Sequence, residues 1–509
     1  MRTLNTLKNV IGNFASNLSL NLLRFVSRII FIKCLNEVYL GVNGLLSNVL
    51  GLLALSELGI STAINYSLYK PLEEKDENKI RSLMNFYKKA YTVIALVVTV
   101  AGIVLLPFLP HFIKDTTGIE NLSIIYLIFL ANMVIGYLFG YKRTLITADQ
   151  KSYKITPFLI FFNFLTTILQ IIVLLLFKHY IIYLLMQTIC IIFEHIFVNR
   201  YIEKEYPYIK NLKNSEKLDS DELGKIKTNV KALLMHQIGT YVFLSTDNLI
   251  ISKFIGIVTV GIYSNYVLVV NMIKSFISTL TNNAIASVGN LIASKDESRK
   301  YKVFKEMDFV CFVLYGVSSL CFITLFTPFI EFCFGSKFLL DDLTLYLIVF
   351  NHYVSGMNAV PIMFVSSSGL YDKDKYVPLI QSIVNLVISI VLAIKIGIAG
   401  VLIGTAVSNL FPYIIKPYII HKHILHEKLS TYFKTAIKQF IVITIALLII
   451  LFIINLIPVS NLILQMIINL AVTGIISLLI IFIVYGKTEE FNSLLGRVKY
   501  LISRKKGSE

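Results

Sequence analysis

The first apolar stretch of the sequence carries a line of side chains that can bind an anion. If the stretch is helical, Asn13, Asn17, Asn21, Arg24 and Arg28 fall within about 80° of arc. Lipid is a poor partner for such a face, because polar groups are costly in hydrocarbon. The two arginines are four residues apart, so their guanidinium groups share one face and can bind phosphate oxygens bidentately. We expect Arg24 and Arg28, with Asn17 and Asn21, to bind an anionic headgroup.

Three later apolar stretches carry similar polar stripes at helical spacing. Their members are Asn43, Ser47, Glu57, Ser61 and Asn65 in one, Asn229, His236, Thr240 and Asp247 in the next, and Ser264, Asn271, Ser275, Ser278 and Asn282, with Lys274 at the edge, in the third. Four such helices predict a hydrophilic vestibule within the membrane. Lys274 joins the arginines in attracting an anion there, while Asn271, His236 and Thr240 are expected to hydrogen-bond hydroxyl groups of the same ligand. The alternative is that Arg28 and Asp247 form an interhelical ion pair and that the asparagines hold helices together.

Two acidic residues lie inside these apolar stretches. Burial disfavours the charged form of a carboxylate, so Glu57 and Asp247 are candidates for coupling a proton or a cation to transport. Equally, each carboxylate can simply neutralise a nearby arginine or lysine.

Motifs for other chemistry are absent from the sequence. It contains no Walker A, HExxH or GxSxG pattern, and its five cysteines show no CxxC spacing. We expect no metal site, no cofactor and no catalytic residue.

The elements that position the stripes are membrane-spanning helices. Of 509 residues, 56% are hydrophobic and only 15% are charged, and apolar runs of about 20 residues recur along the whole chain. An all-α polytopic membrane protein is therefore expected. The fourteen predicted spans are 11–35, 40–65, 86–109, 121–141, 155–177, 180–199, 229–254, 260–288, 306–328, 343–364, 377–396, 399–420, 437–457 and 462–485.

The distribution of lysine and arginine sets the expected topology. With fourteen spans both termini share one side, and the segments on that side hold 38 basic residues against six on the other. Cationic loops are retained in the cytoplasm, so both termini are predicted to be cytoplasmic. This placement explains the net charge of +17 without a nucleic-acid partner.

An internal repeat divides the predicted spans. At a constant offset of 220 residues, Gly41 falls on Gly261 and Gly136 on Gly356. Transporter repeats of this kind build two bundles around a substrate cavity. The predicted domains are an N-terminal six-helix bundle (1–205), a cytoplasmic linker (206–228), a C-terminal six-helix bundle (229–425), and two additional helices with a basic cytoplasmic tail (426–509).

The segment that runs from Glu57 to Pro71, ELGISTAINYSLYKP, followed by Leu83-Met84-Asn85, resembles the second-span region of polysaccharide flippases of low-GC bacteria. These O-antigen and capsular polysaccharide flippases belong to the superfamily of lipid II flippases and multidrug and toxin extruders. The resemblance implies a bacterial cytoplasmic-membrane protein with a cationic central cavity. It also implies movement of an undecaprenyl-diphosphate-linked oligosaccharide from the inner to the outer leaflet by alternating access, with a polysaccharide biosynthesis complex as a candidate partner.

Three rival functions remain open. A cation-coupled multidrug extruder of the same superfamily would be expected to have an acid-lined pocket, which the arginines disfavour. A membrane polysaccharide polymerase or glycosyltransferase generally needs a sizeable outer loop, and the predicted loops are short. A scaffold for a biosynthetic complex would leave the polar stripes unexplained.

Overall fold

The computed structural model describes residues 23–54, 60–115, 118–212, 215, 218, 224, 238–282, 285–294 and 296–496. Within these ranges the chain is helical, with no β-strand. The expected all-α class is therefore confirmed. The helices of the first half are 23–34, α2 (Glu37–Leu53), α3 (Ile60–Glu74), α4 (Glu77–Leu105), α5 (Leu122–Gly140), α6 (Arg143–Ala148), α7 (Thr156–Phe177), α8 (Tyr180–Glu205) and 238–250. Those of the second half are α10 (Ile257–Asn282), α11 (Ile285–Ala293), α12 (Glu297–Phe334), α13 (Asp342–Met357), α14 (Ala359–Ser368), α15 (Tyr371–Asp374), α16 (Val377–Ile396), α17 (Ile398–Ile420), α18 (Leu429–Asn455) and α19 (Leu462–Tyr485).

Eleven helical stretches in the described part are long and apolar enough to cross a membrane. Each of them overlaps one of the predicted spans. The other three predicted spans, 11–35, 40–65 and 229–254, run into residues outside the described ranges, so the count of fourteen stays approximate. The chain is a multi-pass membrane protein.

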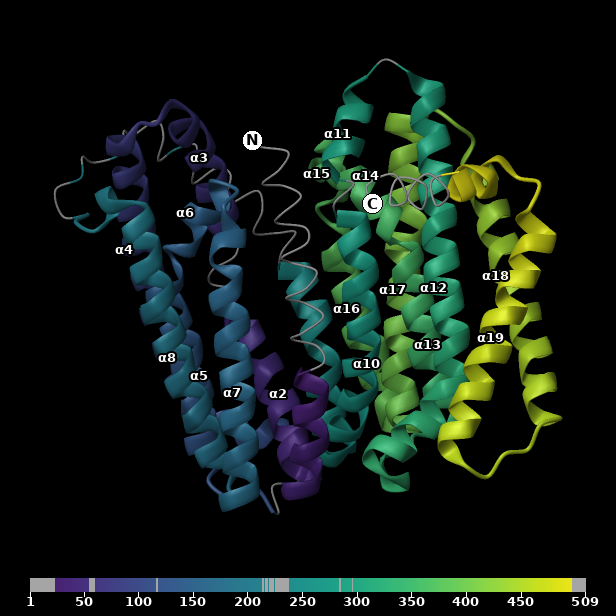
Figure 1. Cartoon of the computed structure of the whole chain (residues 1–509), viewed down its shortest axis with the longest axis horizontal. Helices are drawn as coiled ribbons and strands as arrows, with labels where there is room; N and C mark the ends of the chain where they lie inside the picture. The colour runs from purple at the N-terminus through teal and green to yellow at the C-terminus, as the bar shows by residue number, and fades with distance from the viewer. Residues whose placement is uncertain are drawn as a thin grey trace, which may run out of the picture. The chain divides into compact units, whose positions relative to one another are not determined.

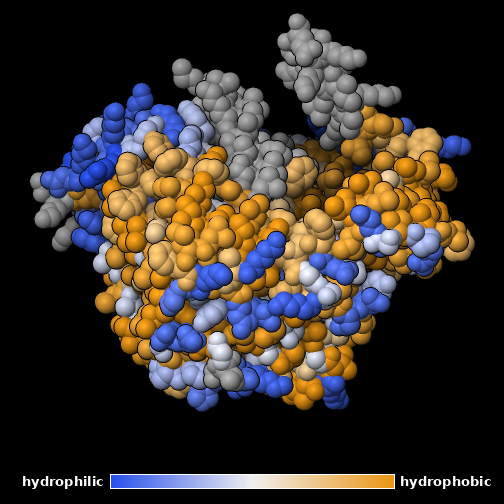
Figure 2. All heavy atoms as spheres, turned by 60° about the horizontal axis from the view of Figure 1, so that its bottom comes forward, coloured by the Kyte–Doolittle hydropathy of each residue, from blue (hydrophilic) through white to orange (hydrophobic). Residues whose placement is uncertain are grey.

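The helix α4 shows why these elements belong in lipid. One face of α4 is buried through Tyr87, Tyr91 and Val98. The opposite face is also apolar and is half or more exposed, at Val93, Leu96, Val97, Val100, Ile103 and Val104. In water that outer face would be polar, whereas hydrocarbon accepts it. Figure 2 shows such hydrophobic side chains (orange) over broad areas of the surface, with hydrophilic ones (blue) gathered in separate zones.

Contacts between residues divide the chain into two compact units. Unit 1 comprises Met1–Ser264, Pro378–Leu386 and Ala393–Gly397, and unit 2 comprises Asn265–Val377, Val387–Leu392 and Ile398–Glu509. Both α10 and α16 contribute to both units. The six-plus-six domain limits expected from the repeat stay a prediction.

In unit 1, four long helices, α4, α5, α7 and α8, run alongside one another (Figure 1). The α7 helix packs along α8, and α5 contacts both α4 and α8. Polar caps mark two helix starts, since the side chains of Asn36 and Asp76 accept hydrogen bonds from the first backbone N–H groups of α2 and α4.

Also within unit 1, α2 crosses the start of α10 at two glycines. A Cβ atom added to Gly41 would lie 1.9 Å from the carbonyl oxygen of Ile257. A Cβ atom added to Gly261 would lie 2.9 Å from the carbonyl oxygen of Glu37 and 3.1 Å from the backbone nitrogen of Gly41. The two repeat-related glycines therefore meet each other, as residues around a local two-fold axis do. Only hydrogen at these positions lets the two backbones approach so closely.

In unit 2, the 38-residue helix α12 packs against α13, α18 and α19. The buried residues of α19 recur every four positions, and they are Asn469, Thr473, Ser477, Ile481 and Tyr485. Asn469 donates from Nδ2 to the carbonyl oxygen of Thr324 at 2.8 Å, and the hydroxyl oxygens of Thr324 and Thr473 lie 3.1 Å apart. Small and polar side chains thus join α19 to α12, while the remaining faces of α19 present leucine and isoleucine outward.

Candidate functional site

Arg28 is the best-placed member of the predicted anion site. It lies on helix 23–34, partly buried in unit 1 beside the rings of Tyr180 and Tyr183. Its Nη1 donates to Oγ of Ser264 at 3.0 Å, and the Ser264 hydroxyl donates in turn to the carbonyl oxygen of Gly261 at 2.8 Å. Ser264 is a member of the polar stripe predicted for span 260–288, so the structure brings two predicted stripes together at this contact.

The geometry leaves the guanidinium able to bind an anion. A guanidinium carries five N–H donors, and the bond to Ser264 uses one of them. Arg24 lies one helical turn earlier and is exposed. Two permanent positive charges on one helix face can hold the oxygens of a phosphate or diphosphate bidentately.

Aromatic rings support the helix that carries Arg28. The ring of Phe31 packs edge-on against Tyr180 and Tyr183, with centroid distances of 5.6 and 5.4 Å. Tyr39 packs against Tyr180 at 4.8 Å. These contacts fix one side of helix 23–34, which limits the positions that Arg28 can take.

Lys274 stands in a second polar cluster, within unit 2. It lies on α10, and its Nζ donates to Oγ of Ser355 on α13 at 3.0 Å. His352, one turn before Ser355, lies near Lys274 and makes a 2.9 Å hydrogen bond between its Nε2 and Oγ of Ser318 on α12. The predicted neighbour Asn271 is exposed one turn before Lys274. The cluster joins one cation to two hydroxyls and an imidazole, which are groups suited to an anionic or hydroxylated ligand.

Sequence reasoning did not identify Ser318, His352 and Ser355. Two of them could have been found from their spacing in the sequence. His352 and Ser355 are three residues apart in an apolar span and therefore share a helix face.

The remaining predicted residues are only partly placed. Thr240 and Asp247 lie on helix 238–250 in unit 1, both partly buried, and Asp247 is near Tyr263. Their neighbour Thr246 donates to Oδ1 of Asn385 on α16 at 2.9 Å. The pairing of Arg28 with Asp247 stays a prediction. Six further predicted residues lie outside the described ranges, namely Asn13, Asn17, Asn21, Glu57, Asn229 and His236.

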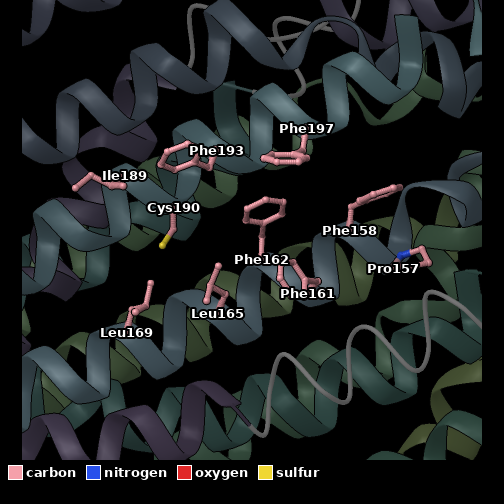
Figure 3. A pocket seen from close by; sticks show the side chains of 10 residues that line it. All are labelled: Pro157, Phe158, Phe161, Phe162, Leu165, Leu169, Ile189, Cys190, Phe193 and Phe197. Atoms are coloured by element: carbon pink, nitrogen blue, oxygen red, sulfur yellow. The ribbon is translucent and has the colours of Figure 1, made fainter. Parts of the chain in front are cut away.

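An apolar groove runs between α7 and α8 in unit 1, with a volume of about 680 Å³. Figure 3 shows Phe158, Phe162 and Leu165 on one helix facing Phe193 and Phe197 on the other. Such a lining can hold a hydrocarbon chain but offers no donor or charge to a phosphate. The groove and the Arg28 contact therefore suit opposite ends of an amphiphile.

The sequence matches a known protein family, and the fold matches solved structures of membrane transporters. A family model described as "Polysaccharide biosynthesis protein" matches residues 6–286, more than half of the chain. No curated protein sequence matches. Among solved structures, the inward-facing conformation of a multidrug resistance MATE family transporter of the MOP superfamily has a TM-score of 0.63 and 12% identity, covering 81% of this chain and 98% of that one. The inward closed conformation of the lipid II flippase MurJ has a TM-score of 0.62 and 17% identity, covering 93% and 98%.

A third match is a mutant of the Vibrio cholerae MATE transporter VcmN, with a TM-score of 0.58 and 12% identity, covering 84% of this chain and 99% of that one. At such identities these structures establish the fold alone. The family match confirms the resemblance found in the sequence. The chain belongs to the polysaccharide biosynthesis protein family, and its fold is that of the MOP-superfamily transporters.

Proposed function

We propose that this protein is a flippase that moves an undecaprenyl-diphosphate-linked oligosaccharide from the inner to the outer leaflet of the bacterial cytoplasmic membrane, for surface polysaccharide export. The observation that carries the proposal is Arg28, a partly buried cation among apolar helices whose guanidinium donates a hydrogen bond to the hydroxyl of Ser264. Membership of the polysaccharide biosynthesis family supports a sugar-bearing cargo. The match to a lipid II flippase supports a lipid-linked one.

Each part of such a cargo has a chemical counterpart in the chain. The diphosphate binds the guanidinium groups of Arg24 and Arg28, and sugar hydroxyls bind polar side chains of unit 1 such as Ser264. The polyprenyl tail stays in lipid, where an apolar surface such as the α7–α8 groove accepts it. The tail is surrounded by hydrocarbon or by apolar side chains at every stage of transport. The binding energy that drives alternating access must therefore come from the headgroup. Both termini are proposed to be cytoplasmic, following the positive-inside distribution of basic residues.

The test replaces both arginines. In the double variant Arg24→Ala with Arg28→Ala, two charge-assisted contacts are lost, worth roughly 3–6 kcal/mol together, so affinity falls by more than about a hundredfold. Surface polysaccharide should disappear while the protein still inserts in the membrane. A matched control removes two exposed cations elsewhere, Lys88→Ala with Lys89→Ala, and should export normally.

The same strains separate the proposal from its rivals. A strain that lacks the protein should accumulate lipid-linked oligosaccharide in the inner leaflet and should keep its resistance to cationic drugs. Full export by the arginine variant would remove the proposed phosphate site. Loss of drug resistance without accumulation of lipid-linked sugar would instead identify a multidrug extruder.

A further inference from the structure

A second polar pocket lies within unit 2, between α12, α18 and the chain just after α19. Its volume is about 300 Å³. Its walls are largely aromatic, formed by Phe304, Phe309, Tyr432 and Tyr485. It contains none of the residues that the proposed function uses.

A buried carboxylate lies in this pocket. Asp308 is only 5% exposed, and its Oδ2 accepts a hydrogen bond from Nε2 of Gln439 at 3.2 Å. Its other oxygen, Oδ1, has no hydrogen-bond partner among the described residues. An ionised carboxylate in such a place needs a positive partner, because burial of an unpaired charge is expensive.

The other unmatched polar atoms lining the pocket can also accept hydrogen bonds. They are Oε1 of Gln439, Oη of Tyr432, Oη of Tyr485 and Nε2 of His421, none with a partner in the described part of the chain. The Nδ1 of His421 is bonded to the carbonyl oxygen of Pro417 at 2.9 Å, so in the neutral ring Nδ1 carries the proton and Nε2 is an acceptor. The pocket therefore presents unmatched acceptors and tyrosine hydroxyls beside the Asp308 carboxylate.

Each of the two lysines that line the pocket has a partner in the pocket wall. Nζ of Lys305 lies 3.1 Å from the Glu490 carboxylate. Nζ of Lys438 lies 4.8 Å from the ring centroid of Tyr485. When Asp308 is ionised, a positive ligand from outside the chain can match its charge.

These features select an organic ammonium. An –NH₃⁺ group has three donors and no acceptor, which complements a set of acceptors, and aromatic walls attract cations. An alkali or alkaline-earth ion would need a tight cage of oxygens rather than a roomy aromatic chamber. We propose that the pocket around Asp308 and Gln439 binds the primary ammonium group of an amine.

The depth of the pocket indicates two sources for such an amine. Asp308 precedes the end of α12 at Phe334 by 26 residues, which is about 39 Å of helix. Hydrocarbon is only about 30 Å thick, and the charged pair of Lys305 and Glu490 at the pocket belongs outside it, so we place the pocket at the headgroup level of the membrane. The amine is either a free solute or the headgroup of an aminophospholipid, whose phosphate would meet Lys305 and Lys438 at the rim.

The chain contains no tryptophan, so a single introduced tryptophan can report binding. Thr435→Trp places one on an exposed residue that lines the pocket. The full-length protein is reconstituted in phosphatidylglycerol nanodiscs and titrated with ethanolamine hydrochloride, with sodium chloride as the ionic control. The second arm compares these nanodiscs with ones that contain phosphatidylethanolamine. A saturable change of fluorescence is expected in at least one arm, and the arm that responds identifies the source.

Two variants decide the outcome. Asp308→Asn keeps the shape and removes the charge, so affinity should fall at least about tenfold; Gln439→Leu should weaken binding in the same direction. The matched control Glu427→Gln changes an exposed carboxylate outside the pocket and should bind within about twofold of the parent. No response in either arm, equal responses to sodium chloride, or unchanged affinity in folded Asp308→Asn and Gln439→Leu would overturn the proposal. Because Arg24 and Arg28 take no part, the double arginine variant should bind the amine normally even if the flippase proposal fails.

Discussion

The crossing of α2 over α10 gives the sharpest prediction for the fold. Replacement of Gly41 by alanine puts a Cβ atom 1.9 Å from the carbonyl oxygen of Ile257, and that atom belongs to backbone rather than to a flexible side chain. An ordinary carbon–oxygen contact is about 3.3 Å, so the helices must separate by more than about 1 Å. Overpacking of this kind costs about 3 kcal/mol, of which the better helix propensity of alanine offsets about 1. We expect Gly41→Ala to lower the free energy of unfolding by about 2 kcal/mol.

The control for this experiment is another helical glycine of unit 1. A Cβ atom added to Gly136 meets no atom within 4 Å, so Gly136→Ala should leave stability unchanged or raise it by up to about 1 kcal/mol. Both variants are unfolded at equilibrium in mixed micelles of increasing dodecyl sulfate content. The expected difference between them is about 2–3 kcal/mol. Equal stabilities for Gly41→Ala and Gly136→Ala would refute the close approach of α2 and α10.

Two further outcomes concern buried or capping charges of unit 2. Asp374→Asn removes the charged partner of Lys416, whose side chain is 7% exposed, and should destabilise the protein by about 3–5 kcal/mol in thermal unfolding. The double variant Asp374→Leu with Lys416→Met leaves no unpaired buried charge and should recover most of that loss. Asp341→Ala removes the cap of α13 and should cost about 1 kcal/mol at neutral pH. Burial raises the pKa of Asp341, but hydrogen bonds from Thr344 outweigh burial and lower the pKa below the ordinary 3.8. The ionised cap therefore stabilises the protein above pH 3.8. The difference in stability between Asp341→Ala and the parent should vanish as the pH falls through the lowered pKa.

Most of the membrane spans could be predicted from hydropathy, because a span is a long run of apolar residues. The limits of α12 could not be predicted in this way. The predicted span is 306–328, whereas the helix runs from Glu297 to Phe334. Its first turns are charged and are invisible to a hydropathy window, yet a helix capped by Asp296 continues in water as readily as in lipid.

The candidate site was predictable as residues but not as contacts. The stripe of span 260–288 identified Ser264, and the structure adds that it holds Arg28, which is 236 residues away. The partner of Lys274, Ser355, is 81 residues away and belonged to no predicted stripe. Asp308 was also missed, because it follows the charged first turns of α12 and forms no periodic polar stripe within the apolar part of the helix. Long-range pairs of this kind depend on how helices pack, which one sequence does not specify.

The repeat illustrates the same limit. Gly41 and Gly261 are equivalent in sequence and do meet in space. Gly136 and Gly356 are equally related, yet an added Cβ atom meets nothing at Gly136 and meets the ring of Tyr315 at 2.1 Å at Gly356. An offset between two segments identifies equivalent positions but not equivalent surroundings.

The polar stripe of α19 determines what holds the C-terminal hairpin in place. Its contacts with Thr324 are hydrogen bonds in a medium where apolar side chains gain little by leaving lipid. Agents that act by weakening the hydrophobic effect in water therefore have little effect on the contact between α19 and α12. Alcohols that dissolve in the bilayer and compete for donors and acceptors act on it directly. The hairpin of α18 and α19 is therefore held against α12 by these hydrogen bonds together with the packing of apolar side chains such as Phe312 and Ile481, and its release requires that both kinds of contact are replaced.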